Sequence, residues 1–179
     1  MGVLWMAGPR YGVAMRWRDL FDDLEAQMMR SEREAFEDEV RERAGGERAV
    51  VTVGAVLAAS VGETIRLVLV DGSRVEGAVT DAAAQWLHVA DGPREWLVPA
   101  TAIATIDGVP SGAPDPGAIA ARLTLGHALR ALADDGGEVL VRVAGTECRG
   151  RISGVGADYL VVGSRVVRFA AVLTVSPAQ

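Results

Sequence analysis

The sequence predicts a mainly β protein in which an N-terminal helix precedes two tandem five-stranded barrels, each led by a short helix. Two observations carry this prediction. Between residues 64 and 108, side chains alternate with a period of two in five short segments, and residues typical of tight turns separate these segments, which indicates five short strands. A weaker copy of that pattern ends the chain, and each copy follows an apolar helical segment. Five short, bent strands are expected to close into a barrel, because closure removes exposed sheet edges.

The first barrel is predicted at residues 50–108, including its leading helix. The bulky residues Ile65, Leu67 and Leu69 alternate with Arg66, Val68 and Val70, the period of two that is typical of a strand. Asp71-Gly72 follows as a hairpin signal because glycine tolerates positive φ. Gly77 lies inside the return strand, where a missing side chain indicates a bend or a close backbone contact. Further strands are expected at residues 85–90, 94–98 and 102–106.

The second barrel is predicted at residues 118–179, after a linker at residues 109–117 that is rich in proline and glycine. When Gly77 is aligned with Gly150, Trp86 falls on Tyr159. After one shorter loop, Ile103 falls on Val172. Similarity at a fixed offset across a helix, a bend and a final strand predicts an internal repeat.

The helix-then-five-strand pattern resembles the Sm-like fold, which includes bacterial Hfq. The residues that carry the resemblance are Leu69-Val70-Asp71-Gly72, Gly77 and Val79, with residues 102–106 in the place of the second motif. SH3-like and PRC-type barrels have similar patterns and stay as alternatives. The Hfq family carries a Tyr-Lys-His cluster where this chain has Val98-Pro99-Ala100-Thr101. The resemblance therefore implies a fold and not an RNA site.

Residues 1–14 are expected to be disordered or to follow a misassigned start, because the segment lacks the features of a signal peptide. An acidic amphipathic helix is predicted at residues 15–46. The first residues of this segment, starting at Met15, resemble the start of an uncharacterised actinobacterial protein family. Two interpretations stay open for the narrow apolar stripe of this helix: a solvated helix that lies partly on the barrels, or a candidate partner-binding surface that also offers a contact for a homodimer. The stripe consists of Leu20, Phe21, Leu24, Met28 and Phe36.

Composition restricts the function. The formal net charge is −6, whereas nucleic-acid binders usually carry a basic surface. All 18 basic residues are arginine, which is typical of a high-GC genome and predicts an actinobacterial source. A single cysteine, Cys148, excludes an internal disulfide and fits a cytoplasmic protein. No apolar run approaches the roughly 20 residues that span a bilayer.

No pattern of catalytic or metal-binding residues stands out. The sequence therefore predicts a non-enzymatic interaction or scaffold protein without metal or cofactor, which binds a protein partner through the barrel faces and the N-terminal helix. Cys148 is expected to be a small buried residue, and His88 is expected to face solvent or the other barrel. The alternative function is an RNA-binding Sm-like regulator that uses the arginine-rich second barrel. Its candidate residues are Arg142, Arg149, Arg151, Arg168 and Tyr159.

Overall fold

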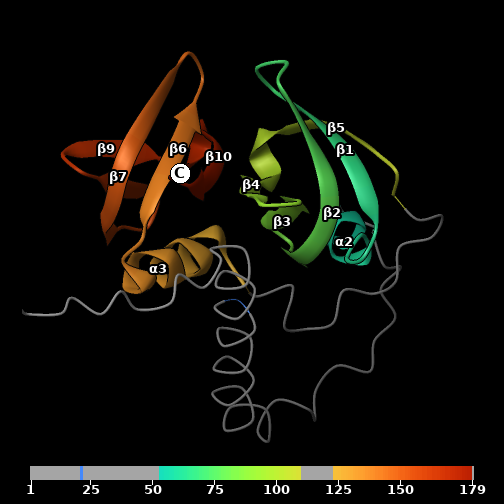
Figure 1. Cartoon of the computed structure of the whole chain (residues 1–179), viewed down its shortest axis with the longest axis horizontal. Coiled ribbons are helices and arrows are strands. Elements are labelled where there is room, and N and C mark those ends of the chain that lie inside the picture. The colour runs from blue at the N-terminus through green and yellow to red at the C-terminus, as the bar shows by residue number, and fades with distance from the viewer. Residues whose placement is uncertain (1–20, 22–52, 110–122, 179) are drawn as a thin grey trace, which may run out of the picture.

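In the computed structural model, the described residues form ten strands of one antiparallel sheet, together with the helices labelled α2 and α3 (Figure 1). The structure describes residues 21, 53–109 and 123–178. The first half consists of α2 (Val53–Ala59), β1 (Thr64–Leu69), β2 (Arg74–Ala83), β3 (Trp86–Asp91), β4 (Arg94–Pro99), the 3₁₀ turn η1 (Ala100–Ala102) and β5 (Ile103–Asp107). The second half consists of α3 (Leu125–Asp135), β6 (Glu138–Val143), β7 (Thr146–Val155), β8 (Tyr159–Val162), β9 (Arg165–Arg168), η2 (Phe169–Ala171) and β10 (Val172–Pro177).

The expectation of two closed five-stranded barrels is wrong. The strand order is β5-β1-β2-β3-β4-β10-β6-β7-β8-β9, which is one open sheet. The prediction assumed that each half would hide its edges by closing on itself. Instead, β4 of the first half pairs antiparallel with β10 of the second half, with Val175 opposite Leu97. One edge of each half is therefore covered by the other half.

The individual strands of the first half were predicted well. Leu67 alternates with exposed Arg66 on β1, and Gly72 in the following turn has the expected positive φ of 82°. The close approach predicted at Gly77 is confirmed, because a Cβ atom there would lie 2.4 Å from the carbonyl oxygen of Ala90. Local alternation and turn chemistry therefore sufficed to place these strands.

The helix before the second half begins at a capped residue. Thr124 is extended, and its side chain accepts a hydrogen bond from the backbone N–H of His127, so α3 starts at Leu125. Such a cap satisfies a backbone donor that has no partner within the helix. Gly136 ends α3 with a left-handed φ of 71°.

Several expected segments lie outside the described residues. These are residues 1–14, the helix at 15–46 apart from Phe21, the linker at 109–117 apart from Val109, and residues 118–122. Phe21 itself is helical and buried.

Irregularities of the ladder fall at matching places in the two halves. The β2–β3 register shifts between Val79 and Asp81, and the β7–β8 register shifts between Ile152 and Gly154. A 3₁₀ turn separates the fourth and fifth strands of each half. Because a bulge bends and twists its strand, both halves are bent at the same positions.

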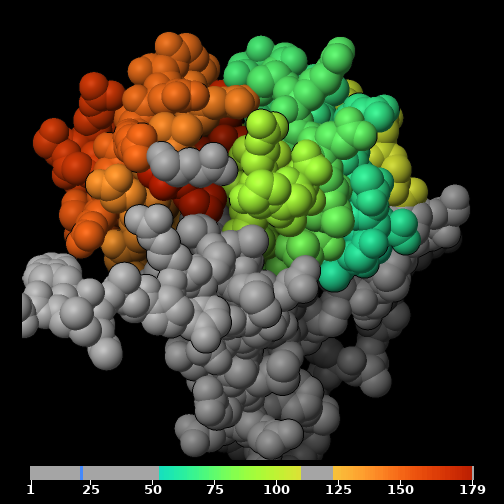
Figure 2. Space-filling view, viewed as in Figure 1, coloured from blue at the N-terminus to red at the C-terminus, as the bar shows by residue number. Residues whose placement is uncertain are grey.

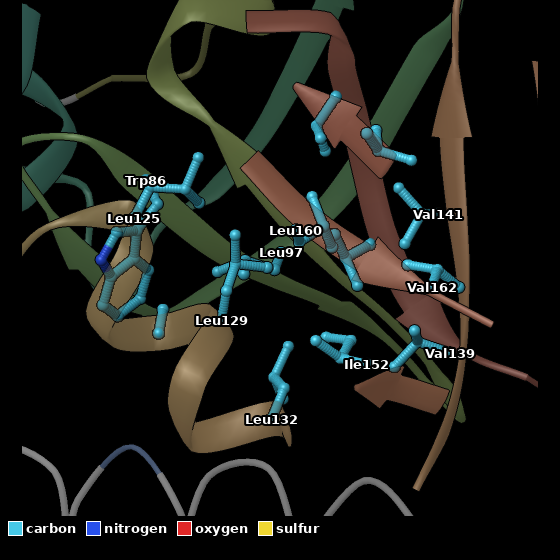
Figure 3. Close-up of a cluster of buried hydrophobic side chains, with 14 of the residues drawn as sticks. Trp86, Leu97, Leu125, Leu129, Leu132, Val139, Val141, Ile152, Leu160 and Val162 are labelled. Atoms are coloured by element: carbon cyan, nitrogen blue, oxygen red, sulfur yellow. The ribbon is translucent and has the colours of Figure 1, made fainter. Parts of the chain in front are cut away.

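Buried side chains form two clusters that cross the boundary between the halves. The α3 cluster packs α3 against β6–β10 and also takes in Trp86 and Leu97 from the first half (Figure 3). The α2 cluster fills the first half and takes in Leu173 from β10. Each half thus contributes side chains to the core of the other, and Figure 2 shows the two halves in direct contact on the visible face.

Candidate interaction site

The four arginines predicted to bind RNA lie in three separate places in the structure. Arg142 extends from β6 toward the turn between β1 and β2 in the first half. Its guanidinium donates a hydrogen bond to the Ser73 hydroxyl and lies 3.8 Å from a carboxylate oxygen of Asp71. The Ser73 hydroxyl and backbone N–H both donate to Asp71, and these bonds lower the pKa of that carboxyl group. Arg142 therefore links the two halves.

Arg149 and Arg151 lie two residues apart on β7 and are both exposed. Glu138 of β6 sits opposite Arg151 in the strand register. The same carboxylate lies 3.6 Å from the Nε atom of Arg149. Cross-strand pairs of opposite charge contribute little stability, but they break up a continuous positive surface.

Arg168 and Tyr159 are brought together by the β8–β9 hairpin, where they lie directly opposite each other. Tyr159 is 41% exposed, so its ring is accessible, and Arg168 is exposed as well. Among the five residues predicted to bind nucleic acid, Arg168 and Tyr159 are the two that place a cation next to an exposed aromatic ring.

The structure adds Arg165 to these residues, which the candidate set for RNA omits. Arg165 begins β9, and its guanidinium lies 3.4 Å from the carbonyl oxygen of Glu147 and 3.7 Å from the Cys148 sulfur. These residues and Arg149 border an open pocket of about 320 Å³. Cys148 is buried, as the sequence predicted. Arg165 and Cys148 are 17 residues apart in the sequence, so no local pattern could have indicated that these side chains meet.

A buried polar group lies on the side of β3 that faces away from the α2 cluster. His88 is 1% exposed and points away from Leu87 and Val89, as alternation required, so the alternative that it faces solvent is wrong. The alternative that it faces the other half fits better, because Leu97, which lies opposite it in the strand register, belongs to the α3 cluster. Its Nδ1 atom lies 2.5 Å from the Thr80 hydroxyl, and its Nε2 atom lies 3.6 Å from the Glu95 carboxylate. Phe21 packs against its ring at 5.1 Å.

Hydroxyl, imidazole and carboxylate thus follow one another, an order used in nucleophilic catalysis. Here His88 and Glu95 are both almost fully buried, so a substrate has no access to them in this conformation. We assign the group a structural role, in which Thr80 satisfies one nitrogen of a histidine inside the protein. Within residues 53–109 and 123–178, no set of three histidine, cysteine or acidic side chains could hold a metal ion.

The predicted partner-binding stripe is represented by Phe21 alone. This side chain is 1% exposed, and its ring lies 5.1 Å from that of Trp86. Phe21 therefore packs into the protein's own core. Leu20, Leu24, Met28 and Phe36 lie outside the described residues.

Comparison with known proteins assigns no family to this arrangement. No protein-family model matches the chain, and no curated protein is detectably similar to it in sequence. Across the helices that the structure describes, none is long and apolar enough to cross a membrane.

Proposed function

We propose that the protein is a non-enzymatic interaction module that holds a protein partner on the exposed surface of its sheet. The observation that carries the proposal is the pairing of arginines with acids. Arg66 lies 3.1 Å from Glu76, Arg149 lies beside Glu138, and Arg142 lies beside Asp71. A surface of alternating sign favours a complementary protein surface, because phosphate recognition needs accumulated positive charge.

The two halves support the further proposal that the protein arose by duplication of one five-stranded unit. Each half has the strand order fifth-first-second-third-fourth, and the bulge in its second strand falls at the same place. The resemblance to the Sm-like family rests on Asp71, Gly72 and Gly77, and it also stays a proposal.

A photo-crosslinking residue at position 151 tests the partner directly. Arg151 is exposed on β7, and benzoylphenylalanine placed there in the full-length chain in its host is expected to capture one discrete protein other than the chain itself. Val61, which is 49% exposed in the turn after α2, is the matched control position. Equal capture at both positions, or capture of nothing but a second copy, would contradict the proposal.

The second candidate function is RNA binding, which the exposed pair of Tyr159 and Arg168 favours. Titration of a mixed single-stranded RNA pool with the full-length protein separates the two candidates. An interaction module is expected to bind the pool weakly, even at low salt. Tight binding that falls steeply with salt, and that weakens on replacing Arg168 with glutamine, would establish the RNA function instead.

A further inference from the structure

The β8–β9 hairpin of the second half is shorter than the matching β3–β4 hairpin of the first half. β3 and β4 have six residues each, whereas β8 and β9 have four each. Counted back from the 3₁₀ turns, Arg165 of β9 matches Trp96 of β4, and each lies opposite a valine of the preceding strand. The first half then adds two more pairs, which end at Asp91 opposite Arg94, whereas the second half turns at once. The second half therefore lacks the outer end of this hairpin.

A pocket lies beside β7 at the place where the longer hairpin would continue. In the first half, β3 reaches across Gly77 of β2, where an added Cβ atom would lie 2.4 Å from the carbonyl oxygen of Ala90. In the second half, the β7–β8 ladder starts at Ile152, so the part of β7 before it has no β8 partner in the described structure. The open pocket of about 320 Å³ lies against this part of β7 and against the β8–β9 turn. The shorter hairpin thus leaves room for a ligand.

The lining of the pocket is positive on one side and apolar on the other. Arg149 of β7, Arg165 of β9 and Ser164 of the turn supply hydrogen-bond donors. Among the described residues that line the pocket, the acidic one is Glu147, so the lining is net positive by one charge. Two further lining residues, Val162 and Cys148, belong to the α3 cluster.

Arg165 is held at the pocket by neutral atoms. Its guanidinium lies 3.4 Å from the carbonyl oxygen of Glu147 and 3.7 Å from the Cys148 sulfur. In the described part of the chain Arg165 forms no ion pair, whereas Arg66 and Arg142 each lie beside a carboxylate. Because a guanidinium has five N–H donors in a planar fork, these two contacts leave most of the donors available to a ligand.

Arg149 has an acidic neighbour, but the pair is exposed. Its Nε atom lies 3.6 Å from the Glu138 carboxylate, and both side chains are more than half exposed. Such a pair contributes little stability because water screens it, so an anion in the pocket can compete for Arg149. A carboxylate matches the guanidinium fork and carries one charge. A phosphate monoester carries nearly two at pH 7, which exceeds the net charge of the lining.

We propose that this pocket binds the carboxylate of a small organic acid. Arg149 and Arg165 hold the carboxylate, and the apolar part of the acid lies against Val162 and Cys148. Small-molecule sites enclose roughly 300–1,000 Å³, so a pocket of about 320 Å³ suits an acid with a short chain or a single ring. The proposal goes beyond the partner-binding function and does not depend on it, because the ligand is a small molecule.

Titration of the isotope-labelled full-length protein with benzoate, followed by amide chemical shifts, tests the proposal. Benzoate joins a carboxylate to one apolar ring. It is expected to shift the amide signals of Gly163 and Ser164 with a Kd of about 1–10 mM, as suits a ligand of few atoms. Gly92, in the turn of the longer hairpin, is the internal control and is expected to keep its signal. Benzamide has the same shape without the charge and is expected to bind at least about tenfold more weakly.

Two variants with a matched control locate the site. Arg165→Gln and Arg149→Gln are each expected to weaken benzoate binding at least about tenfold, because each removes charged hydrogen-bond donors. Both replace exposed residues, and either one remains informative if the other fails to fold. Arg168→Gln alters an exposed arginine of the same strand that does not line the pocket, and it is expected to keep the wild-type affinity.

Three results would overturn the proposal. The first is the absence of saturable shifts at Gly163 and Ser164 with benzoate concentrations up to about 50 mM, well above the expected Kd. The second is equal binding of benzamide, or undiminished benzoate binding by both folded pocket variants. The third is tighter binding of inorganic phosphate than of benzoate, which would assign the pocket to phosphate groups instead.

Discussion

Replacement of Trp86 with alanine is expected to lower the free energy of unfolding by about 3–5 kcal/mol, the range for a fully buried large aromatic residue. Trp86 is 0% exposed and belongs to the α3 cluster although it lies on β3 of the first half (Figure 3). The substitution therefore opens a cavity between the halves and also removes the ring against which Phe21 packs. Urea unfolding followed by far-ultraviolet circular dichroism measures the change.

Two other variants serve as controls for this prediction. Trp96 on the neighbouring strand is only half-buried, so Trp96→Ala is expected to lower the free energy of unfolding clearly less than Trp86→Ala does. Trp86→Phe keeps an aromatic ring and removes an indole N–H that has no hydrogen-bond partner, so its cost is also expected to be smaller. A loss below about 1 kcal/mol for Trp86→Ala would be ordinary for any substitution and would contradict a core shared between the halves.

Replacement of Gly77 with alanine is expected to lower the free energy of unfolding by about 1–3 kcal/mol, as overpacking does in a well-packed interior. The added Cβ atom would lie 2.4 Å from the carbonyl oxygen and 2.8 Å from the carbonyl carbon of Ala90 on the paired strand. Backbone atoms held in a ladder cannot move aside as a flexible side chain can. The β2–β3 pairing must therefore deform to admit the methyl group.

Gly154 provides the matched control on β7. A Cβ atom there meets nothing closer than 3.8 Å, at a side-chain carbon of Val161. Gly154→Ala is expected to be neutral or to stabilise the protein by up to about 0.5–1 kcal/mol, because glycine is unfavourable inside a strand. Chemical denaturation of both variants under identical conditions tests the comparison. Equal effects at the two positions would contradict the close approach at Gly77.

The strands could be predicted from the sequence because their signals are local. Asp71-Gly72 specifies a turn by its own backbone preference, and the alternation around Leu67 specifies a half-buried strand. How the sheet is completed could not be predicted, because it depends on which distant edge β4 meets. Nothing in the pattern around Leu97 distinguishes pairing with β10 from closure within its own half.

At the candidate site too, local sequence signals could be predicted, whereas contacts between distant segments could not. Alternation correctly put His88 on the side of β3 away from Leu87, but it could not indicate that Phe21, which lies far away in sequence, would pack against the His88 ring. The arginines were visible in the sequence, whereas their acidic neighbours depend on register. Glu138 lies opposite Arg151 only because β6 and β7 pair as they do. A count of arginines therefore overstates the positive surface of the second half.

The most direct test of the account is a nuclear Overhauser experiment on the isotope-labelled protein, aimed at the strand that joins the halves. A single open sheet predicts backbone contacts between Leu97 of β4 and Val175 of β10, together with contacts between Leu67 of β1 and Ile106 of β5. Contacts between β4 and β5 in place of those between β4 and β10 would mean that the first half closes on itself. That result would contradict the joined sheet.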